Sequence, residues 1–159
     1  MNQEPVQTRD VARLVVSRCG QLASPGDLGE PYRLIDAGGA VVEPVGAFLR
    51  ELFAAGRSPA TLRSYSMDLL RWWRFLGAVD VDWRRASRIE ARDFSWWIQL
   101  TVKHRRRPLS DQVVATVESV GPPNPVTGKA ALGPGYAPAT IAHSETVLRG
   151  FYDFQRDIG

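Results

Sequence analysis

Residues 57–77 read RSPATLRSYSMDLLRWWRFLG, and this stretch decides the fold class that the sequence predicts. Ser58 is a preferred N-cap residue, and Pro59 suits the first helical position, where its missing N–H costs nothing. Apolar side chains then recur at helical spacing, at Leu62, Tyr65, Leu69, Trp72, Trp73 and Leu76. The pattern predicts an amphipathic helix over 59–76 that stops at Gly77.

The same stretch opens a strongly basic part of the chain. Residues 57–107 carry 12 basic and 5 acidic side chains, whereas residues 1–56 carry 5 and 7, and residues 108–159 carry 3 and 5. The three net charges of +7, −2 and −2 add up to the formal charge of +3. A basic block of this kind indicates a polyanionic partner, and a solvated arginine-rich surface is the open alternative.

Outward from this helix, three more are expected. Pro44 and Gly56 delimit a helix over 44–55, and a capping box formed by Ser87 and Glu90 starts another over 88–104. The last begins at Pro138 and covers 138–158. Trp72–Trp73 and Trp96–Trp97 are adjacent pairs, so one member of each is expected in the core and the other against a neighbouring helix or loop.

The remaining segments are predicted to be less regular. Residues 31–42 contain two β-prone runs around Gly38-Gly39 and predict a small hairpin. Residues 1–30 have no sustained period and are interpreted as a poorly defined N-terminal arm. The proline- and glycine-rich stretch 105–136 predicts a long surface loop before the last helix, with one turn of helix near 113–117. The fold class is therefore mainly α, a four-helix bundle over 31–159.

Composition excludes several classes of protein. A hydrophobic content of 44% and five tryptophans argue against a disordered chain. No apolar run approaches the roughly 20 residues of a membrane span, and residues 1–10 do not resemble a signal peptide. A single cysteine, Cys19, fits a reducing compartment. We expect a cytoplasmic protein without a membrane partner.

Catalytic signals are weak throughout. One cysteine and two histidines do not form a structural zinc site at the usual spacing. Residues 126–129 read VTGK but lack the rest of a phosphate loop, since Pro123 and Ala130 stand where Gly and Ser or Thr are needed. No Gly-x-Ser-x-Gly nucleophile elbow is present. The sequence predicts no catalytic residues, no metal and no cofactor.

Nucleic-acid binding has better support. Phosphates are bound by arginine, by hydroxyl groups and by backbone N–H groups at helix starts, and residues 57–64 combine all three. Residues 137–144 repeat the combination without arginine, and three arginines follow the third helix. The predicted DNA-binding residues are Arg57, Ser58, Thr61, Arg63, Ser64, Arg71, Arg105, Arg106, Arg107, Thr140, His143 and Ser144. A capped helix with solvated arginines remains the alternative at each of these places.

Two long motifs together resemble a known family. They are Arg57-Ser58-Pro59-x-Thr61-Leu62-Arg63-Ser64-Tyr65-x-x-Asp68-Leu69-Leu70-x-Trp72-x-x-Phe75-Leu76 and Ala137-Pro138-Ala139-Thr140-Ile141-x-His143-Ser144, the latter followed by Val147-Leu148-Arg149-x-Phe151-Tyr152-Asp153-Phe154. With Ala91-Arg92-Asp93-Phe94 between them, they are similar to the N-terminal core-binding domain of tyrosine recombinases, the phage-integrase family. The resemblance covers roughly residues 43–159.

The resemblance implies a SAM-like four-helix bundle whose second and fourth helices face the DNA major groove. It implies double-stranded DNA, a C-terminal catalytic domain and other recombinase protomers as partners. The catalytic residues of that family have no counterpart in this sequence, so the resemblance implies the DNA-binding half of an integrase, as an excised piece or a truncated gene product, monomeric in isolation. A helical protein–protein interaction module is the alternative, and an enzyme in its own right is disfavoured.

Overall fold

The computed structural model describes residues 8–101 and 138–159. In chain order it contains a short 3₁₀ helix η1 (Val11–Arg13), strands β1 (Gln21–Ala23) and β2 (Arg33–Ile35), and the helices α1 (Glu43–Ala54), α2 (Pro59–Val79), α3 (Arg88–Leu100) and α4 (Pro138–Ile158). The predicted loop 105–136, with its turn of helix near 113–117, lies outside the described residues. The mainly helical fold with a small N-terminal hairpin is confirmed.

Helix α2 starts as predicted but ends later. The Ser58 hydroxyl accepts a hydrogen bond from the backbone N–H of Thr61 at 3.2 Å, which caps the first turn. The expected stop at Gly77 is wrong, because the helix runs on to Val79 and Asp80 takes the left-handed conformation at φ 55°. Asp80 N–H then bonds to Gly77 O, and Val81 N–H bonds to Leu76 O. These two bonds form a Schellman cap, in which aspartate stands where glycine is more usual.

The other helix ends follow local signals to different degrees. Gly56 adopts φ 84° after α1, as its place beyond the helix end predicts. The predicted capping box of Ser87 and Glu90 is present at the start of α3. The predicted end near 104 is wrong, because Thr101 is extended, at φ −81° and ψ 126°. Its hydroxyl donates to Trp97 O at 2.7 Å, a local bond that competes with helix continuation.

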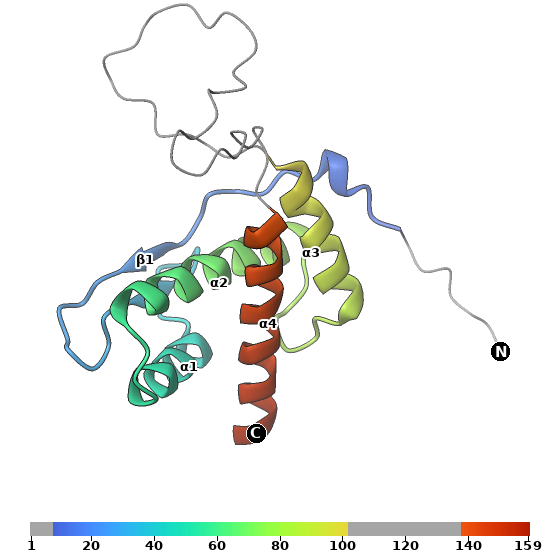
Figure 1. The fold of residues 1–159 in the computed structure, drawn as a ribbon. Helices are drawn as coiled ribbons and strands as arrows, with labels where there is room; N and C mark the ends of the chain where they lie inside the picture. Colours follow the sequence, from blue (N-terminus) through green and yellow to red (C-terminus); the bar gives the residue numbers. More distant parts are fainter. Residues whose placement is uncertain (1–7, 102–137) are drawn as a thin grey trace, which may run out of the picture.

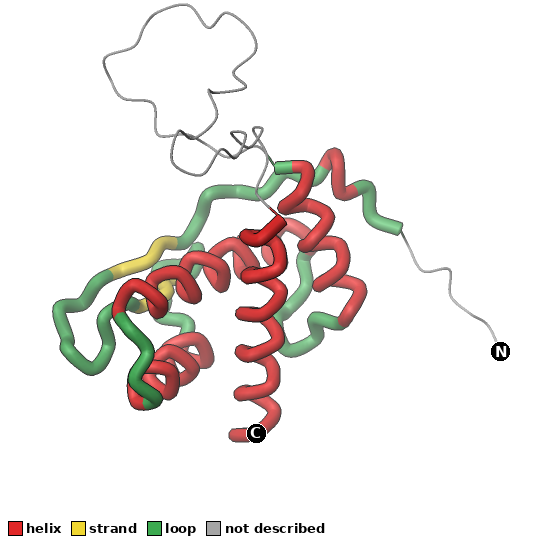
Figure 2. Tube along the Cα trace, viewed as in Figure 1, coloured by secondary structure: helices red, strands yellow, loops and turns green. Residues whose placement is uncertain are grey.

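Helix α4 holds the bundle together. It crosses α2 and contacts α1 and α3 on either side, as Figures 1 and 2 show. The core between the helices is strongly aromatic, with Phe151 of α4 packed edge-on against Phe48 of α1 and against Trp73 of α2. The fully buried large side chains include Val45, Leu62, Leu69, Trp72, Phe75, Phe94, Ile98 and Val147. The apolar face predicted for α2 therefore packs into one core with side chains of the other three helices.

The N-terminal segment is more ordered than an arm. Strand β2 pairs antiparallel with Gln21–Ala23, while the predicted partner 40–42 contributes an isolated bridge between Ile35 and Val41. The turn at Gly38-Gly39 closes with Gly39 N–H bonded to Asp36 O at 3.1 Å. The hairpin thus spans 21–35 rather than 31–42. The prediction missed its first strand because residues 21–23 show no clear sequence period.

Helix α2 anchors the chain just before this hairpin. The Arg74 guanidinium donates to Cys19 O at 2.7 Å and to Gly20 O at 3.0 Å. Burial lowers the pKa of Arg74, whose guanidinium is bonded to backbone carbonyl groups rather than to a carboxylate. Leu70, which is not part of the predicted apolar face of this helix, is only 4% exposed because β1 covers that side of α2.

The first tryptophan pair divides as expected, but the second does so only in part, because Trp96 is exposed rather than packed against a neighbour. Trp72 is buried while Trp73 packs against Trp83, and Trp97 packs against Phe94 while Trp96 is 49% exposed. Within the described ranges, none of the helices combines the length and apolar character needed to cross a bilayer.

Candidate nucleic-acid interface

The starts of α2 and α4 share an open groove of about 460 Å³. Its lining contains five of the predicted DNA-binding residues, which come from two helices far apart in sequence: Arg63, Ser64, Arg71, Thr140 and His143. Ala60 and Ala139 complete the first turns of both helices along the groove, and Met67 and Asp68 form the rest of the lining. Small side chains at the first turns leave backbone N–H groups accessible at the helix starts.

A buried carboxylate joins the two helices below this groove. Asp68 of α2 is 3% exposed and accepts a hydrogen bond from the Ser144 hydroxyl of α4 at 2.8 Å. The His143 ring lies on its other oxygen, with Nδ1 at 2.7 Å from Oδ2. Arg71, one turn further along α2, donates to Oδ1 of the same carboxylate. Three donors therefore surround one acid, which satisfies its charge and fixes α4 against α2.

The His143 ring is held from two sides. Besides its bond to Asp68, it meets the Tyr65 ring edge-on, with centroids 5.5 Å apart and the planes at 89°. The His143 side chain is nevertheless 40% exposed and lines the groove. This arrangement presents an imidazole edge at the surface with a fixed orientation.

Comparison with known proteins gives a match over the part of the chain that contains α1, α2 and α3. Residues 45–106 match the family model of the phage integrase N-terminal SAM-like domain. The predicted resemblance is confirmed for this segment, which includes α2 with its groove residues. Helix α4 lies beyond the matched residues. Searches among curated proteins and among solved structures found no match to the chain.

The match indicates a DNA-binding role related to tyrosine recombinases. It covers the SAM-like domain, and no catalytic domain of that family was found in the chain. Among the residues that the structure describes, no group of three or more His, Cys, Asp or Glu side chains could hold a metal ion.

Three predicted residues of the SAM-like domain lie outside the groove, at the very start of α2. Arg57 and Ser58 are exposed, and Thr61 is half-buried. The Ser58 hydroxyl lies 3.0 Å from the Thr61 hydroxyl in addition to capping the helix. Both hydroxyls thus have a structural role at the N-cap, which agrees with the alternative interpretation of a capped helix.

One of the predicted DNA-binding residues is wrong, and three others lie outside the residues that the structure describes. Ser144 is 1% exposed, because this position of α4 faces α2 and its hydroxyl is bonded to Asp68. It cannot touch DNA without unfolding this contact, so its role is structural. Arg105, Arg106 and Arg107 fall outside the described residues.

Asp68 is the residue that sequence reasoning missed. It shares the polar face of α2 with Ser64 and Arg71, and an acid in a strongly basic helix is an unusual element of a DNA-binding surface. Its partners Ser144 and His143 lie 76 and 75 residues away, so no local pattern predicts the cluster. The one hint in the sequence was the acidic residue itself. A carboxylate that is buried needs hydrogen-bond donors, and here these come from another helix.

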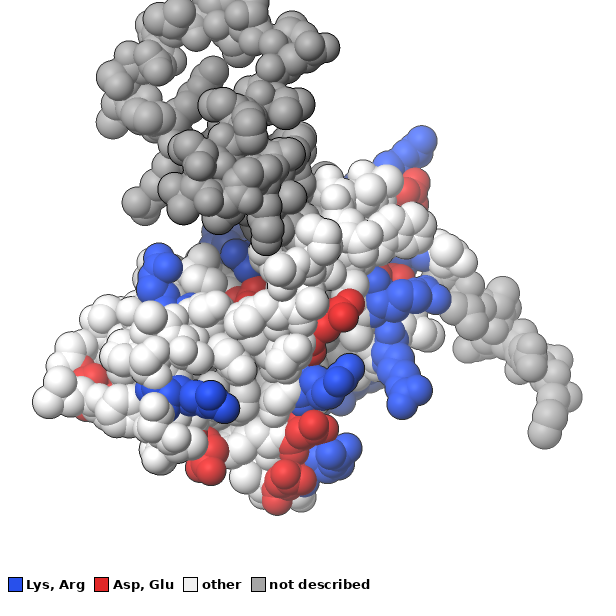
Figure 3. Space-filling view, viewed as in Figure 1, with Lys and Arg blue, Asp and Glu red and all other residues white. Residues whose placement is uncertain are grey.

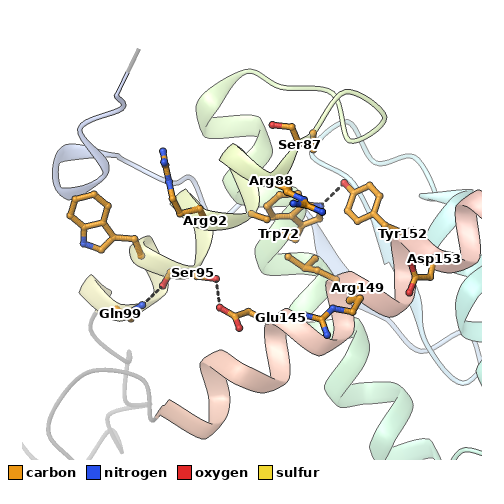
Figure 4. A pocket seen from close by; sticks show the side chains of 14 residues that line it. Trp72, Ser87, Arg88, Arg92, Ser95, Gln99, Glu145, Arg149, Tyr152 and Asp153 are labelled. Atoms are coloured by element: carbon orange, nitrogen blue, oxygen red, sulfur yellow. Dashed lines mark hydrogen bonds between the residues drawn. The ribbon is translucent and has the colours of Figure 1, made fainter. Parts of the chain in front are cut away.

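A second and larger hollow, of about 1080 Å³, lies between α3 and α4 and contains none of the predicted residues. Figure 4 shows Arg88 and Arg92 on one side and Glu145, Arg149 and Asp153 on the other. Glu145 and Asp153 are exposed, so two carboxylates face any ligand that enters. Along α4, basic and acidic side chains also lie interspersed on the face seen in Figure 3. Despite its size, this hollow is a poorer phosphate site than the groove of α2 and α4, where the one acid is buried and satisfied.

Proposed function

We propose that this chain binds double-stranded DNA through the groove formed by the starts of α2 and α4. The observation that carries the proposal is the convergence of Arg63, Ser64, Thr140 and His143 on one groove, in a chain that matches a phage integrase SAM-like domain. The bound DNA is a recombination core site, and strand cleavage belongs to a tyrosine recombinase catalytic domain. Other recombinase protomers on the same DNA are the expected protein partners.

The chemistry of the groove suits a phosphodiester backbone. Arg63 is exposed and has no ion pair among the described residues, so its guanidinium is available for a bidentate phosphate contact. The Ser64 and Thr140 hydroxyls are short donors near the helix starts, where the helix dipoles also favour an anion. Asp68 does not oppose binding strongly, because Arg71, His143 and Ser144 already surround its charge.

Most of the affinity is expected to come from phosphates, and sequence selectivity from side chains that reach base edges. Arg57 lies at the N-terminal end of α2 and adds a further phosphate contact beside the groove. The alternative of a protein–protein module is best represented by the hollow between α3 and α4, where Trp96 is exposed. The two surfaces share α4 but use different residues, so they can be tested separately.

A matched pair of arginine variants tests the proposal. Arg63→Ala and Arg149→Ala remove the same charge from exposed positions in the two different hollows. We expect Arg63→Ala to weaken binding to a mixed-sequence duplex and to lower the slope of log K against log salt by about 0.9, as for one lost phosphate contact. Arg149→Ala is expected to leave the slope unchanged. Equal losses in both variants, or no duplex binding at low salt, would contradict the proposal.

A further inference from the structure

Asp68 determines which nitrogen of His143 carries a proton. A carboxylate that already accepts from the Ser144 hydroxyl and the Arg71 guanidinium can only accept a further hydrogen bond. His143 Nδ1, at 2.7 Å from Asp68 Oδ2, must therefore be the donor. In the neutral ring the single proton is then on Nδ1, and Nε2 carries a lone pair.

The other ring nitrogen is left for a ligand. Nε2 of His143 has no hydrogen bond to any of the residues that the structure describes, and the half-exposed ring lines the groove. With a lone pair on Nε2, the neutral ring repels a phosphate oxygen, which is also an acceptor. When Nε2 is protonated, the ring becomes an imidazolium that donates a hydrogen bond and carries a positive charge.

We propose that His143 binds a DNA phosphate through Nε2 only as the imidazolium, so that the groove takes up one proton from solvent when DNA binds. Asp68 is the positioning residue, because it holds the tautomer that makes this proton necessary. The inference rests on the proposed function of the groove and adds a linkage between DNA affinity and pH. In the complex, the imidazolium lies between two anions, Asp68 and the phosphate.

The surroundings of His143 are compatible with a gain of charge. From α2, the groove is lined by Arg63, Asp68 and Arg71, and the Tyr65 ring packs against the His143 ring in a T-shaped arrangement. The next ionisable residue on α4, Glu145, is turned to α3, where it accepts from the Ser95 hydroxyl at 2.8 Å. Asp68 and the incoming phosphate are the anions that face the ring, and Arg63 and Arg71 are the cations of the groove, neutralised by the phosphate and by Asp68.

The test compares duplex affinity at two pH values and constant ionic strength. The probe is a fluorescently labelled, mixed-sequence DNA duplex of about 20 base pairs without terminal phosphates. Its binding to the 159-residue chain is measured by fluorescence anisotropy. We expect binding to weaken about tenfold from pH 6 to pH 8, the range in which histidine side chains titrate. His143→Gln offers an amide donor at both pH values, so its affinity should not change between them. His104→Gln is the control for the other histidine and should keep the tenfold change.

Asp68→Asn gives an independent test of the positioning role. The asparagine amide can accept from Ser144 and donate to His143 Nδ1, which reverses the tautomer and turns neutral Nε2–H into a donor. We expect this variant to lose the pH dependence of binding. In the free wild-type chain, the ¹⁵N shifts of His143 should show the Nδ1–H tautomer, and in Asp68→Asn the Nε2–H tautomer.

The two proposals fail differently. Wild-type binding that is equally tight at pH 6 and pH 8, or an Nε2–H tautomer in the free chain, would overturn the proton linkage and leave DNA binding intact. Absence of duplex binding at both pH values would overturn the proposed function itself. If Asp68→Asn does not fold, the comparison of wild type with His143→Gln and the wild-type tautomer still decide the question.

Discussion

Glu90 links the N-terminal segment to the start of α3, and its removal should destabilise the fold in a pH-dependent manner. Its side chain is 9% exposed, and it accepts hydrogen bonds from the Ser87 backbone, the Ser87 hydroxyl and Arg9, all at 2.7–2.8 Å. Burial disfavours the ionised form of Glu90, but these hydrogen bonds outweigh burial and lower its pKa to about 2 from an ordinary 4.5.

The pKa of Glu90 determines how much its charge contributes to the free energy of unfolding, and over which pH range. A folded-state pKa of about 2 against 4.5 corresponds to about 3 kcal/mol of stability at neutral pH. Because the Arg9 side chain is 30% exposed and solvent screens its share, we expect about 2 kcal/mol. The folded-state pKa is depressed, so this contribution is complete above about pH 4.5 and is lost as the pH falls towards 2.

Glu90→Gln isolates the charge, because glutamine can keep the hydrogen bonds of a capping box. Urea unfolding followed by tryptophan fluorescence should show a stability gap to wild type of about 2 kcal/mol at pH 7, narrowing to roughly half by pH 3. Glu51→Gln, at an exposed position of α1 without an ion pair among the described residues, is the control and should show little change. A gap that stays constant with pH would refute the electrostatic reasoning.

Three other perturbations probe the contacts between distant segments. Tyr152→Phe should cost about 1–3 kcal/mol in urea unfolding, since the buried Trp72 indole N–H, now 3.1 Å from the Tyr152 hydroxyl, would lose its acceptor; equal stability would contradict that role. Phe75→Ala should cost about 3–5 kcal/mol, because Phe75 is fully buried between Trp72 and Phe94, and a loss below 1 kcal/mol would show that the core closes around the cavity. Arg74→Ala should speed amide hydrogen exchange around Gly20, because it removes the bond to the Gly20 carbonyl. Arg84→Ala, at an exposed position, is the control and should leave this exchange unchanged. Unchanged exchange in both variants would show that Arg74 does not anchor this segment.

Features set by local chemistry were predictable from the sequence. Ser58 and Pro59 mark the start of α2, and Pro138 marks the start of α4, because caps and proline act within one turn of the chain. The capping box of Ser87 and Glu90 is likewise a contact over three residues. The stop at Gly77 failed for a physical reason: glycine in a helix costs only about 1 kcal/mol, and Asp80 provides a complete Schellman cap three residues after Gly77.

Features set by distant contacts were not predictable. Strand β1 has only three residues and no clear alternation, so its pairing with β2 and its cover over Leu70 appear only in the folded chain. The candidate site divides in the same way. The helix starts were identified from their donors, but the burial of Ser144 depends on Asp68, which no nearby sequence pattern pairs with it.

The central claim is that the groove between the starts of α2 and α4 is the DNA-binding surface, and chemical-shift mapping tests it most directly. On addition of a mixed-sequence duplex to ¹⁵N-labelled chain, amide signals of residues 60–71 and 139–143 should shift most, because these residues line or border the groove. The indole N–H of Trp96, in the hollow between α3 and α4, should stay in place. Shifts that gather instead around Trp96, Arg92 and Arg149, with the groove unchanged, would contradict the account.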